Sequence, residues 1–551
     1  MRSALASLFR VSLLPATGLS AALLATALLA CPGRAQSPGL PALHTTAGGA
    51  QLYVDGKPFL ILGAELGNSS AGTAAQAESV LPQLAAEHIN TVLMPVAWET
   101  IEPTEGHFDF SVPDHWIDVA RQHHLHLVLL WFGAWKNSVS SYTPAWVKTN
   151  TVRFPRALAN DGNPLEILST LSSATVAADS HAFAALLQHV RLRDEAQHTV
   201  LMVQVENEVG YLGSGRDRSA TANQAFRQPV PAALLNSLKL HRDEASPELR
   251  AELHLDASSW PGVFGDLAEE AFMAWHYATY IQTVAAAGKQ AYPLPMYVNC
   301  QLPAAQERAG EYPSGGPHPT FLALYRAAAP ALDLYSPDIY WPEFAYWIGR
   351  FTLPGNAVFV PEARTDAAPG NALYALGAAH AFGFSPFGVD GLSPEAVRPL
   401  SATYQMLEDI QPQLLAAQAD KRTRGLVLHA NSPRPSQTVA LGGYLFTASL
   451  LRTWPARTLA TEDGAMLLLQ TAPDEFLIAG SGLSIVPTRD PDADQGVAGI
   501  RSIEELRCSN GSCDVTRRLN GDQSNQGRQL SMDAHQPGIY RVELYSTPVS
   551  K

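Results

Sequence analysis

Eight short apolar runs with strand character alternate along the chain with stretches of helical periodicity. The runs are Phe59–Ala64, Thr91–Pro95, Leu125–Leu130, Val200–Val205, Leu294–Val298, Leu332–Ser336, Ala357–Val360 and Gly383–Val389. The amphipathic stretches between them include Ser111–His124, His181–Arg193, Ala268–Ala287 and Asn371–Phe382. Strands that alternate with helices form parallel sheets, and eight strands close a barrel. The pattern predicts a (β/α)8 TIM barrel, with an open three-layer sheet as the alternative.

The segments on either side of these runs have different patterns. Residues 51–59 predict a hairpin that turns at Asp55-Gly56, so the barrel and its hairpin would occupy residues 36–392. Residues 393–421 read as a helical linker. From residue 422 the apolar positions recur every second residue, as at Tyr540, Val542 and Leu544. Residues 422–551 therefore predict an antiparallel β-sandwich-like domain.

The first 35 residues have the features of a signal peptide. Arg2 and Arg10 give a basic start, a Leu- and Ala-rich stretch follows, and Gly33-Arg34-Ala35 offers a cleavage site. The alternative is a lipoprotein box ending at Cys31, which would carry lipid. Both predict export to the periplasm or the outside, the second with a tether to the outer membrane. No later stretch reaches the roughly 18 apolar residues of a spanning helix, so we expect no integral membrane span.

The cysteines fit an oxidising compartment. Cys508 and Cys513 flank Ser-Asn-Gly-Ser, and Asn510-Gly511 is a tight-turn signal. We therefore predict a disulfide across a hairpin. A zinc site is the alternative, but it would need two more ligands. Cys300 has no C-x-x-C partner, and we expect it to be a buried thiol.

Composition argues against several classes of function. The formal net charge is −14 and no Lys/Arg cluster is visible, which argues against a nucleic-acid partner. The 10 Trp and 17 Tyr suit a neutral sugar substrate. Metalloprotease, serine hydrolase and P-loop motifs are missing, and His123–His126 reads as a polar turn at the far end of the barrel. We expect no cofactor and no metal.

Two glutamates, Glu208 and Glu362, each follow an apolar run, the fourth and the seventh. Barrel enzymes place their chemistry at the carboxyl ends of the strands, so these side chains should face each other across the mouth. Cleavage of a glycosidic bond uses such a pair of carboxyl groups. The sequence therefore predicts a glycoside hydrolase. A buried salt-bridge role for each glutamate is the alternative.

Two motifs in the sequence resemble motifs of a known family of glycoside hydrolases. Gln204–Gly210 (QVENEVG) resembles the QVENEYG signature of family 35 glycoside hydrolases, the retaining β-galactosidases. Trp98–Phe110 is similar to their W-x-x-x-E-P-x-x-G-x-[FY]-x-F stretch. With Leu130–Asn137, Ser336–Tyr340 and the β-rich tail, the chain resembles the bacterial exported subgroup of that family.

The resemblance implies specific roles and a substrate. Glu208 would be the acid/base and Glu362 the nucleophile of a double displacement, with Arg364 as a candidate to orient Glu362. The substrate would be terminal non-reducing β-D-galactosyl residues of oligosaccharides, such as plant cell-wall xyloglucan fragments. The chain departs from the family pattern at Val209 and within Trp98–Pro103, both at sugar-contact positions. A related β-glycosidase or transglycosidase, or a non-catalytic carbohydrate-binding protein, is the alternative.

Sugar contacts are predicted from polar and aromatic residues near strand ends. Asn207 is expected to bind the hydroxyl beside the anomeric carbon, while Glu206 is expected to be structural. Two alternatives, contact with the sugar and hydrogen bonding to nearby protein groups, apply to Glu102, Asn299 and Tyr340. Three tryptophans lie near strand ends, and one of them is expected to stack on sugar while the others pack in the core: Trp98, Trp131 and Trp135. Trp98 and Trp131 are the two predicted as substrate-binding residues.

The long connection from Val209 to about Ala268 is expected to build or cover the active site. Its aromatic residues Tyr211, Trp260 and Phe264 could contact sugar or pack the connection onto the barrel.

Overall fold

The computed structural model describes residues 39–432, 436–451, 462–493 and 496–548. The predicted signal peptide, residues 1–35, and the alternative lipid site at Cys31 lie outside the described residues. In the described part of the chain, no helix combines the length and the apolar character that a membrane crossing requires.

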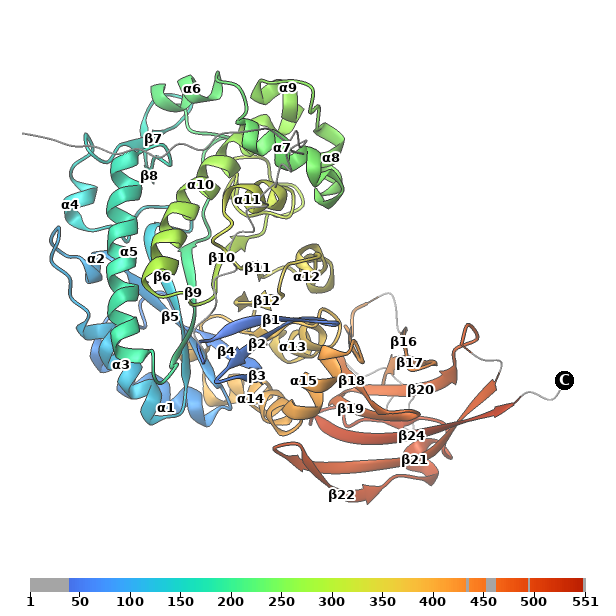
Figure 1. Cartoon of the computed structure of the whole chain (residues 1–551). Helices are drawn as coiled ribbons and strands as arrows, with labels where there is room; N and C mark the ends of the chain where they lie inside the picture. Colours follow the sequence, from blue (N-terminus) through green and yellow to red (C-terminus); the bar gives the residue numbers. More distant parts are fainter. Residues whose placement is uncertain (1–38, 433–435, 452–461, 494–495, 549–551) are drawn as a thin grey trace, which may run out of the picture. The chain divides into compact units, whose positions relative to one another are not determined.

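Parallel strands form the centre of the molecule (Figure 1), and each of the eight predicted runs overlaps one of them. They are β4 (Ile61–Glu65), β5 (Thr91–Ala97), β6 (His126–Lys136), β9 (Val200–Asn207), β10 (Met296–Gln301), β11 (Leu334–Ile339), β12 (Phe359–Val360), β13 (Glu362–Ala363) and β14 (Gly383–Phe384). The order in the sheet is β12-β14-β4-β5-β6-β9-β10-β11-β13.

The sheet closes through its seventh strand, which Pro361 divides into β12 and β13. Val360 of β12 lies opposite Phe384 of β14, and Glu362 of β13 lies opposite Asp338 of β11. Proline has no N–H to give to a strand ladder, so the strand is interrupted there although the chain runs on. The two halves join the ends of the sheet into an eight-stranded barrel. The open-sheet alternative is wrong.

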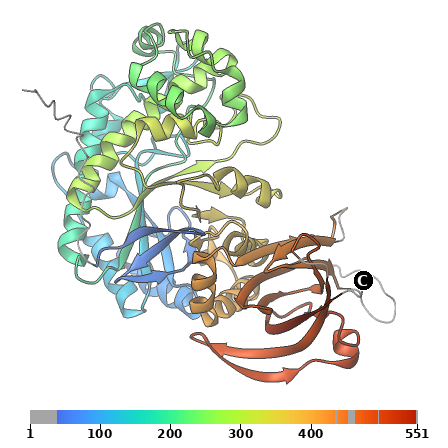
Figure 2. The ribbon, with the colours of Figure 1, turned by 45° about the vertical axis from the view of Figure 1, so that its right-hand side comes forward.

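Helices surround the strands, as the two views in Figures 1 and 2 show. They are α1 (Ala74–Ala86), α3 (Ser111–Gln122), α5 (Ser173–Asp194), α10 (Ala268–Ala291), α11 (Leu322–Ala328), α12 (Phe344–Phe351), α13 (Ala368–Gly377) and α14 (Pro394–Asp409). Helix α5 begins where the Ser172 side chain accepts a hydrogen bond from the Thr175 amide, and its buried face includes Phe183 and Leu187. The apolar layer between helices and strands is the main core of the protein.

The predicted helical linker consists of α14 and α15 (Gln411–Ala419). Helix α14 packs on the barrel rather than only connecting two parts. The hydroxyl of Tyr404 donates to the carbonyls of Gly63 and Phe384, at 2.9 and 3.0 Å, and these residues belong to β4 and β14. Helix α14 therefore covers the first and last strands of the barrel.

A three-stranded meander precedes the barrel, formed by β1 (Ala42–Thr46), β2 (Gly49–Val54) and β3 (Lys57–Phe59). The predicted turn at Asp55-Gly56 is present, and Asp55 has the positive φ (52°) that such tight turns require. Leu52 and Val54 of β2 share an apolar cluster with interior residues of the barrel such as Leu130. The meander therefore packs against the inside of the barrel.

The long connection after β9 contains short helices α6 (Ala220–Phe226), α7 (Ala232–Leu240), α8 (Pro247–Glu252) and α9 (Trp260–Phe264). Other short elements lie between β5 and α5: α2 (Trp98–Ile101), α4 (Ala145–Lys148), β7 (Arg156–Leu158) and β8 (Pro164–Leu168). Tyr211, Trp260 and Phe264 are buried, and Tyr211 donates to the carbonyl of Leu158 at 2.6 Å. These rings pack the connection onto the barrel.

The C-terminal part consists of two antiparallel sheets that share one apolar core, which agrees with the predicted sandwich-like architecture. The first contains β15 (Thr423–Leu428), β18 (Gly464–Ala472), β19 (Glu475–Ser481), β24 (Gly538–Pro548), β21 (Gly496–Ser509) and β22 (Ser512–Arg518). The second contains β16 (Ser436–Leu441), β17 (Tyr444–Leu450), β20 (Leu483–Arg489) and β23 (Leu530–Ser531).

Barrel helix α13 packs directly against β15 and β18. The hydroxyl of Thr423 donates to the carbonyl of Gly377 at 2.9 Å. A Cβ at position 377 would lie 2.5 Å from the carbonyl oxygen of Arg424, so only glycine permits this approach. The two backbones therefore touch without an intervening side chain.

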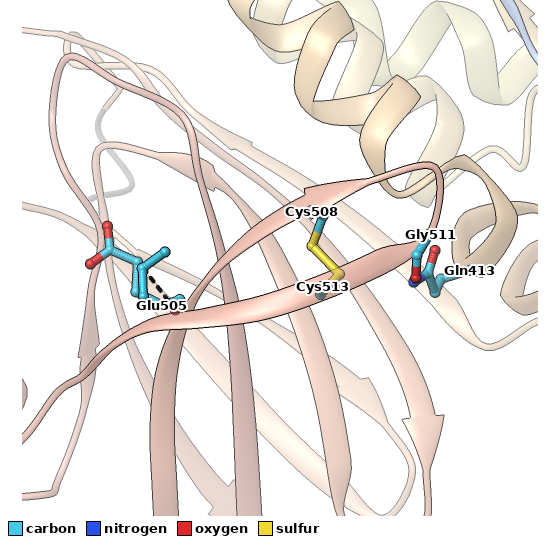
Figure 3. The surroundings of a disulfide bond; sticks show 6 residues. Gln413, Glu505, Cys508, Gly511 and Cys513 are labelled. Atoms are coloured by element: carbon cyan, nitrogen blue, oxygen red, sulfur yellow. Dashed lines mark hydrogen bonds between the residues drawn. A yellow bond between two sulfur atoms is a disulfide. The ribbon is translucent and has the colours of Figure 1, made fainter.

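The predicted disulfide joins Cys508 and Cys513 across the β21–β22 hairpin (Figure 3). The tip of the hairpin reaches the α14–α15 segment. The Gly511 amide donates to the carbonyl of Asp409 at 2.8 Å, and Gln413 Nε2 donates to the carbonyl of Gly511 at 2.5 Å. Because these cysteines bond to each other, the zinc alternative is wrong. Cys300 is a buried free thiol, as expected.

Candidate active site

Three carboxyl groups converge at the carboxyl-end face of the barrel strands. Glu208 follows β9, Asp338 lies near the end of β11, and Glu362 begins β13. One oxygen from each lies within 4.8 Å of the other two. The exposed fractions of these residues are only 3, 1 and 5%. The structure thus brings together the two glutamates that the sequence singled out and adds Asp338.

The position of Glu208 is fixed through both its side chain and its backbone. Asn137 Nδ2 donates to Glu208 Oε2. The backbone amide of Glu208 donates to Asn299 Oδ1 at 2.8 Å, and its carbonyl accepts from the Ser138 amide at 3.1 Å. Burial, and then the negative charge of Glu362, raise the pKa of Glu208 to about 7, against the opposing charge of Lys136. A proton can therefore be held on this carboxyl near neutral pH.

The side chain of Glu362 accepts a hydrogen bond from a residue that follows the neighbouring strand. The hydroxyl of Tyr340, just after β11, donates to Glu362 Oε1. Among the described residues, Oε2 of Glu362 has no hydrogen-bond partner. The predicted helper Arg364 instead binds Asp366, with Nε 2.9 Å from Oδ1. Tyr340 is therefore the residue that contacts Glu362.

Three further charged residues in this region were missed in the sequence: Glu65, Lys136 and Asp338. Burial and the charge of Glu362 raise the pKa of both Glu65 and Asp338 well above the usual carboxyl range. Lys136, which is 6% exposed, lowers the pKa of Glu65 and of Glu208 by its positive charge. All three lie at or near the carboxyl ends of barrel strands. The strand-end criterion that selected Glu208 would also have found them.

The three converging carboxyl groups are spaced closely enough to surround a hard cation. Each, however, already accepts a hydrogen bond from a neighbouring residue: Glu208 from Asn137, Asp338 from Asn299 at 2.7 Å, and Glu362 from Tyr340. Burial and the charge of Glu362 raise the pKa of both Asp338 and Glu208, so these carboxyl groups hold protons more readily than ordinary ones.

Asn207 and Asn299 differ in whether their side-chain amide groups already have hydrogen-bond partners. Neither side-chain atom of Asn207 that can form hydrogen bonds has a partner among the described residues, although the residue is fully buried. A buried amide without partners is costly, and a ligand would satisfy it. Asn299 uses both of its groups, on Asp338 and on the backbone of Glu208. Of the two alternatives left open for Asn299, the structure favours local hydrogen bonding.

Trp98 and Glu102 bind each other. Trp98 Nε1 donates to Glu102 Oε2 at 2.9 Å, and the Gly106 amide donates to Oε1 at 2.7 Å. Trp98 is fully buried and Glu102 is 2% exposed. These contacts shape the loop after β5, so local bonding is favoured for Glu102.

The prediction that Trp131 contacts sugar is wrong. Its Nε1 donates to Asp179 Oδ1 of α5 at 2.8 Å, and its ring lies 5.6 Å from that of Phe183. A strand that is apolar on both faces does not reveal which side chains face the helices, so the sequence could not distinguish them. Trp135 is fully buried too. Two accessible rings follow β11, those of Tyr340 and Trp341, 39 and 37% exposed, and Tyr340 contacts Glu362.

Two family models match parts of the sequence. Residues 71–236 match the glycoside hydrolase family 42 model, described as beta-galactosidase, and residues 400–531 match a domain of unknown function, DUF5597. The first match includes Glu208. No curated protein matches the chain.

Solved structures with a similar fold include beta-mannanase from the blue mussel Mytilus edulis, at 12% identity and a TM-score of 0.41, covering 66% of this chain and 96% of that one. Beta-galactosidase from the psychrophilic Marinomonas ef1 has 13% identity and a TM-score of 0.44, covering 65% of this chain and 61% of that one. The catalytic domain of beta-amylase from Paenibacillus polymyxa has 12% identity and a TM-score of 0.44, covering 61% and 94%.

The closed barrel, the buried carboxyl groups at its strand ends and the beta-galactosidase family match define the protein as a glycoside hydrolase. The matching model is that of family 42, whereas the motifs in the sequence resemble family 35.

Proposed function

We propose that the protein is a retaining β-glycosidase that removes terminal non-reducing β-D-galactosyl residues from oligosaccharides. The observation that carries the proposal is the approach of Glu208 and Glu362, whose nearest ligand oxygens lie within 4.8 Å. Carboxyl groups of retaining enzymes lie roughly 5–5.5 Å apart, whereas inverting enzymes need roughly 6.5–9.5 Å to admit a water molecule. The short separation supports direct attack by one carboxylate.

In the first step, Glu362 attacks the anomeric carbon and Glu208 gives its proton to the leaving oxygen. Tyr340 occupies Oε1 of Glu362, and the described residues leave Oε2 without a partner. Oε2 is therefore the attacking atom in the proposed mechanism. The glycosidic bond breaks as the bond from Oε2 to the sugar forms, and the leaving alcohol departs neutral with the proton from Glu208.

In the second step, Glu208 takes a proton from water and the resulting hydroxide attacks the same carbon, which releases Glu362. Esterification removes the negative charge of Glu362, one of the causes of the raised pKa of Glu208. The pKa of Glu208 falls at that stage, so the same carboxyl changes from acid to base.

The choice of a galactosyl substrate has separate support. The family model that covers residues 71–236 is described as beta-galactosidase, and the QVENEVG motif resembles a β-galactosidase signature. The unpartnered amide of Asn207 suits the hydroxyl beside the anomeric carbon. We extend the proposal to plant cell-wall oligosaccharides of the xyloglucan type, following the subgroup that the motifs resemble.

Replacing each glutamate separately tests the proposal. Glu362→Ala should abolish turnover of an aryl β-D-galactoside, and added azide should restore some activity by forming the α-galactosyl azide. Glu208→Ala should still turn over 2,4-dinitrophenyl β-D-galactoside, and azide should then give the β-azide. NMR of the wild-type product should show the β-anomer first. An α-anomer first, or ligand binding by the wild type without turnover, would refute the mechanism.

A panel of aryl β-glycosides tests the sugar. Galactoside should be turned over faster than glucoside or xyloside, and xyloglucan oligosaccharides should release free galactose. Faster turnover of glucoside or xyloside would replace the galactosyl assignment with a related specificity. Galactose that appears mainly on acceptor sugars would indicate a transglycosidase.

We also propose that the protein is exported. Mass spectrometry of the mature chain should find Gln36 as the first residue. A lipid-modified Cys31 would identify the tethered form, and an intact residue 1 in the purified native protein would contradict export by cleavage.

A further inference from the structure

Two more carboxyl groups meet behind the strand that carries Glu208. Asp179 lies on α5 and Glu206 on β9, and both residues are fully buried. Asp179 Oδ1 and Glu206 Oε1 lie 2.8 and 2.7 Å from the point where a Cβ on Gly133 would stand, so the two carboxyl groups face each other there. Oε1 of Glu206 has no hydrogen-bond donor among the described residues. Ionised carboxylates only accept hydrogen bonds, so this approach requires a proton on one of the two groups.

The other contacts indicate which carboxyl holds that proton. Asp179 accepts from Trp131 Nε1 and from the hydroxyl of Tyr280, each at 2.8 Å. Glu206 Oε2 accepts from the Trp135 amide at 2.8 Å. Because donors surround Asp179, it is best suited to the ionised form. The proton is therefore assigned to Glu206 Oε1, the oxygen that no described donor contacts. Burial and the charge of Asp179 raise the pKa of Glu206 well above the usual range, which agrees with this assignment.

Gly133 of β6 makes the contact possible. A Cβ at this position would lie 2.2 Å from Trp131 Nε1, 2.7 Å from Glu206 Oε1 and 2.8 Å from Asp179 Oδ1. Any other residue would place a carbon among these three atoms. The backbone of β6 is thus shaped to let the carboxyl groups meet.

Glu206 is connected to the site through two strand ends. Glu206 and Glu208 both have positive φ, 60° and 43°, which is costly for residues with side chains and persists only where the surroundings enforce it. This local twist directs Glu206 toward α5, while Glu208 joins the carboxyl cluster. The bond from the Trp135 amide to Glu206 also fixes the end of β6, two residues before Asn137, which contacts Glu208.

We propose that Glu206 is a positioning residue: its proton, shared with Asp179, locks the ends of β6 and β9 together and so holds Glu208 and Asn137 in place. The proposal rests on the acid/base role proposed for Glu208. Tyr280 on α10 is a titratable side chain that faces the pair, since its hydroxyl donates to Asp179. The arrangement needs a donor at Glu206 and an acceptor at Asp179, and it is therefore not symmetrical.

That asymmetry provides the test. Glu206→Gln keeps a donor toward Asp179 and an oxygen toward the Trp135 amide, so its kinetics should stay close to wild type. Asp179→Asn has the same shape but turns an amide donor toward surrounding donors. Its kcat/KM should fall at least roughly tenfold on aryl glycosides with poor leaving groups, which need the acid. With 2,4-dinitrophenolate, which leaves without a proton, we expect a much smaller loss.

Tyr280→Phe removes only one hydroxyl from Asp179 and should give a smaller loss with the same preference for poor leaving groups. Glu270→Gln on the same helix is the matched control, because Glu270 is also a buried carboxyl and binds Tyr312 instead. Equal effects of Glu206→Gln and Asp179→Asn, or equal losses on good and poor leaving groups, would overturn the inference. Glu208→Gln in the same assay separates the two proposals: if it lacks the leaving-group preference, the proposed function fails instead.

Discussion

Tyr340, at the end of β11, donates a hydrogen bond to Glu362, the first residue of β13. A hydrogen bond to a charged group is worth about 1.5–3 kcal/mol. We predict that Tyr340→Phe lowers kcat roughly 10–100-fold, because the carboxylate loses the donor that orients it, with little change in KM. Steady-state kinetics on an aryl β-galactoside measure this. Tyr346→Phe is the control, since Tyr346 is more exposed and binds Arg350. Equal losses in the two variants would exclude a specific role for Tyr340.

The pH dependence of the reaction should follow Glu208. The first step needs this carboxyl protonated, and its pKa is raised to about 7, so kcat/KM should fall as the pH rises through about 7. Lys136 lowers the pKa of Glu208, so in Lys136→Met the fall of kcat/KM (the alkaline limb of the pH profile) should move to higher pH. A pH–rate profile of both proteins measures the shift. If the limb stays in place in Lys136→Met, Lys136 does not act on the acid.

The stability of the folded protein should also depend on the protonation of Glu208. The pKa of Glu208 is raised in the folded state from 4.5 to about 7, so folded protein binds this proton more tightly than unfolded protein. Its stabilising effect is complete below pH 4.5 and is lost as the pH rises toward 7. Glu208→Gln avoids burying the charge and should therefore be more stable than wild type at pH 8, by roughly 3 kcal/mol, but not at pH 4. Thermal unfolding at both pH values tests this, and a gap that is independent of pH would contradict it.

The disulfide should stabilise the folded protein without affecting its turnover of substrate. Closing a short loop is worth about 2 kcal/mol through the entropy of the unfolded chain. The double variant Cys508→Ser/Cys513→Ser should lose about that much stability, while activity on an aryl substrate stays unchanged, because the hairpin contacts the α14–α15 segment rather than the strand ends. Denaturant unfolding measures the loss, with Cys300→Ser as the single-thiol control. Loss of activity in the folded double variant would show that the hairpin influences the site.

The barrel could be predicted from the sequence because its signals are local. Each apolar run overlaps a barrel strand, and Glu208 and Glu362 follow runs whose ends the barrel topology places at one mouth. Pro361 also has a local meaning, since its missing N–H interrupts the seventh strand. Pattern and topology together were therefore enough to bring these two glutamates together.

Other parts of the site depend on contacts that no local pattern encodes. The strands are apolar on both faces, so the outward orientation of Trp131 became clear only from its bond to Asp179 on α5. The carboxyl of Asp338 and the charge of Lys136 acquire their importance from neighbours on other strands. The approach of Asp179 to Glu206 likewise brings a helix and a strand together and cannot be read from either segment alone.

The direct backbone contact between α13 and β15 determines how this enzyme can be produced. A shortened gene product that stops after α15 would lose the strand that lies on Gly377 and would expose the helix surface that β15 and β18 cover. Such a fragment would present apolar side chains to water and tend to aggregate. Recombinant work should therefore keep the barrel and the terminal sheets in one polypeptide.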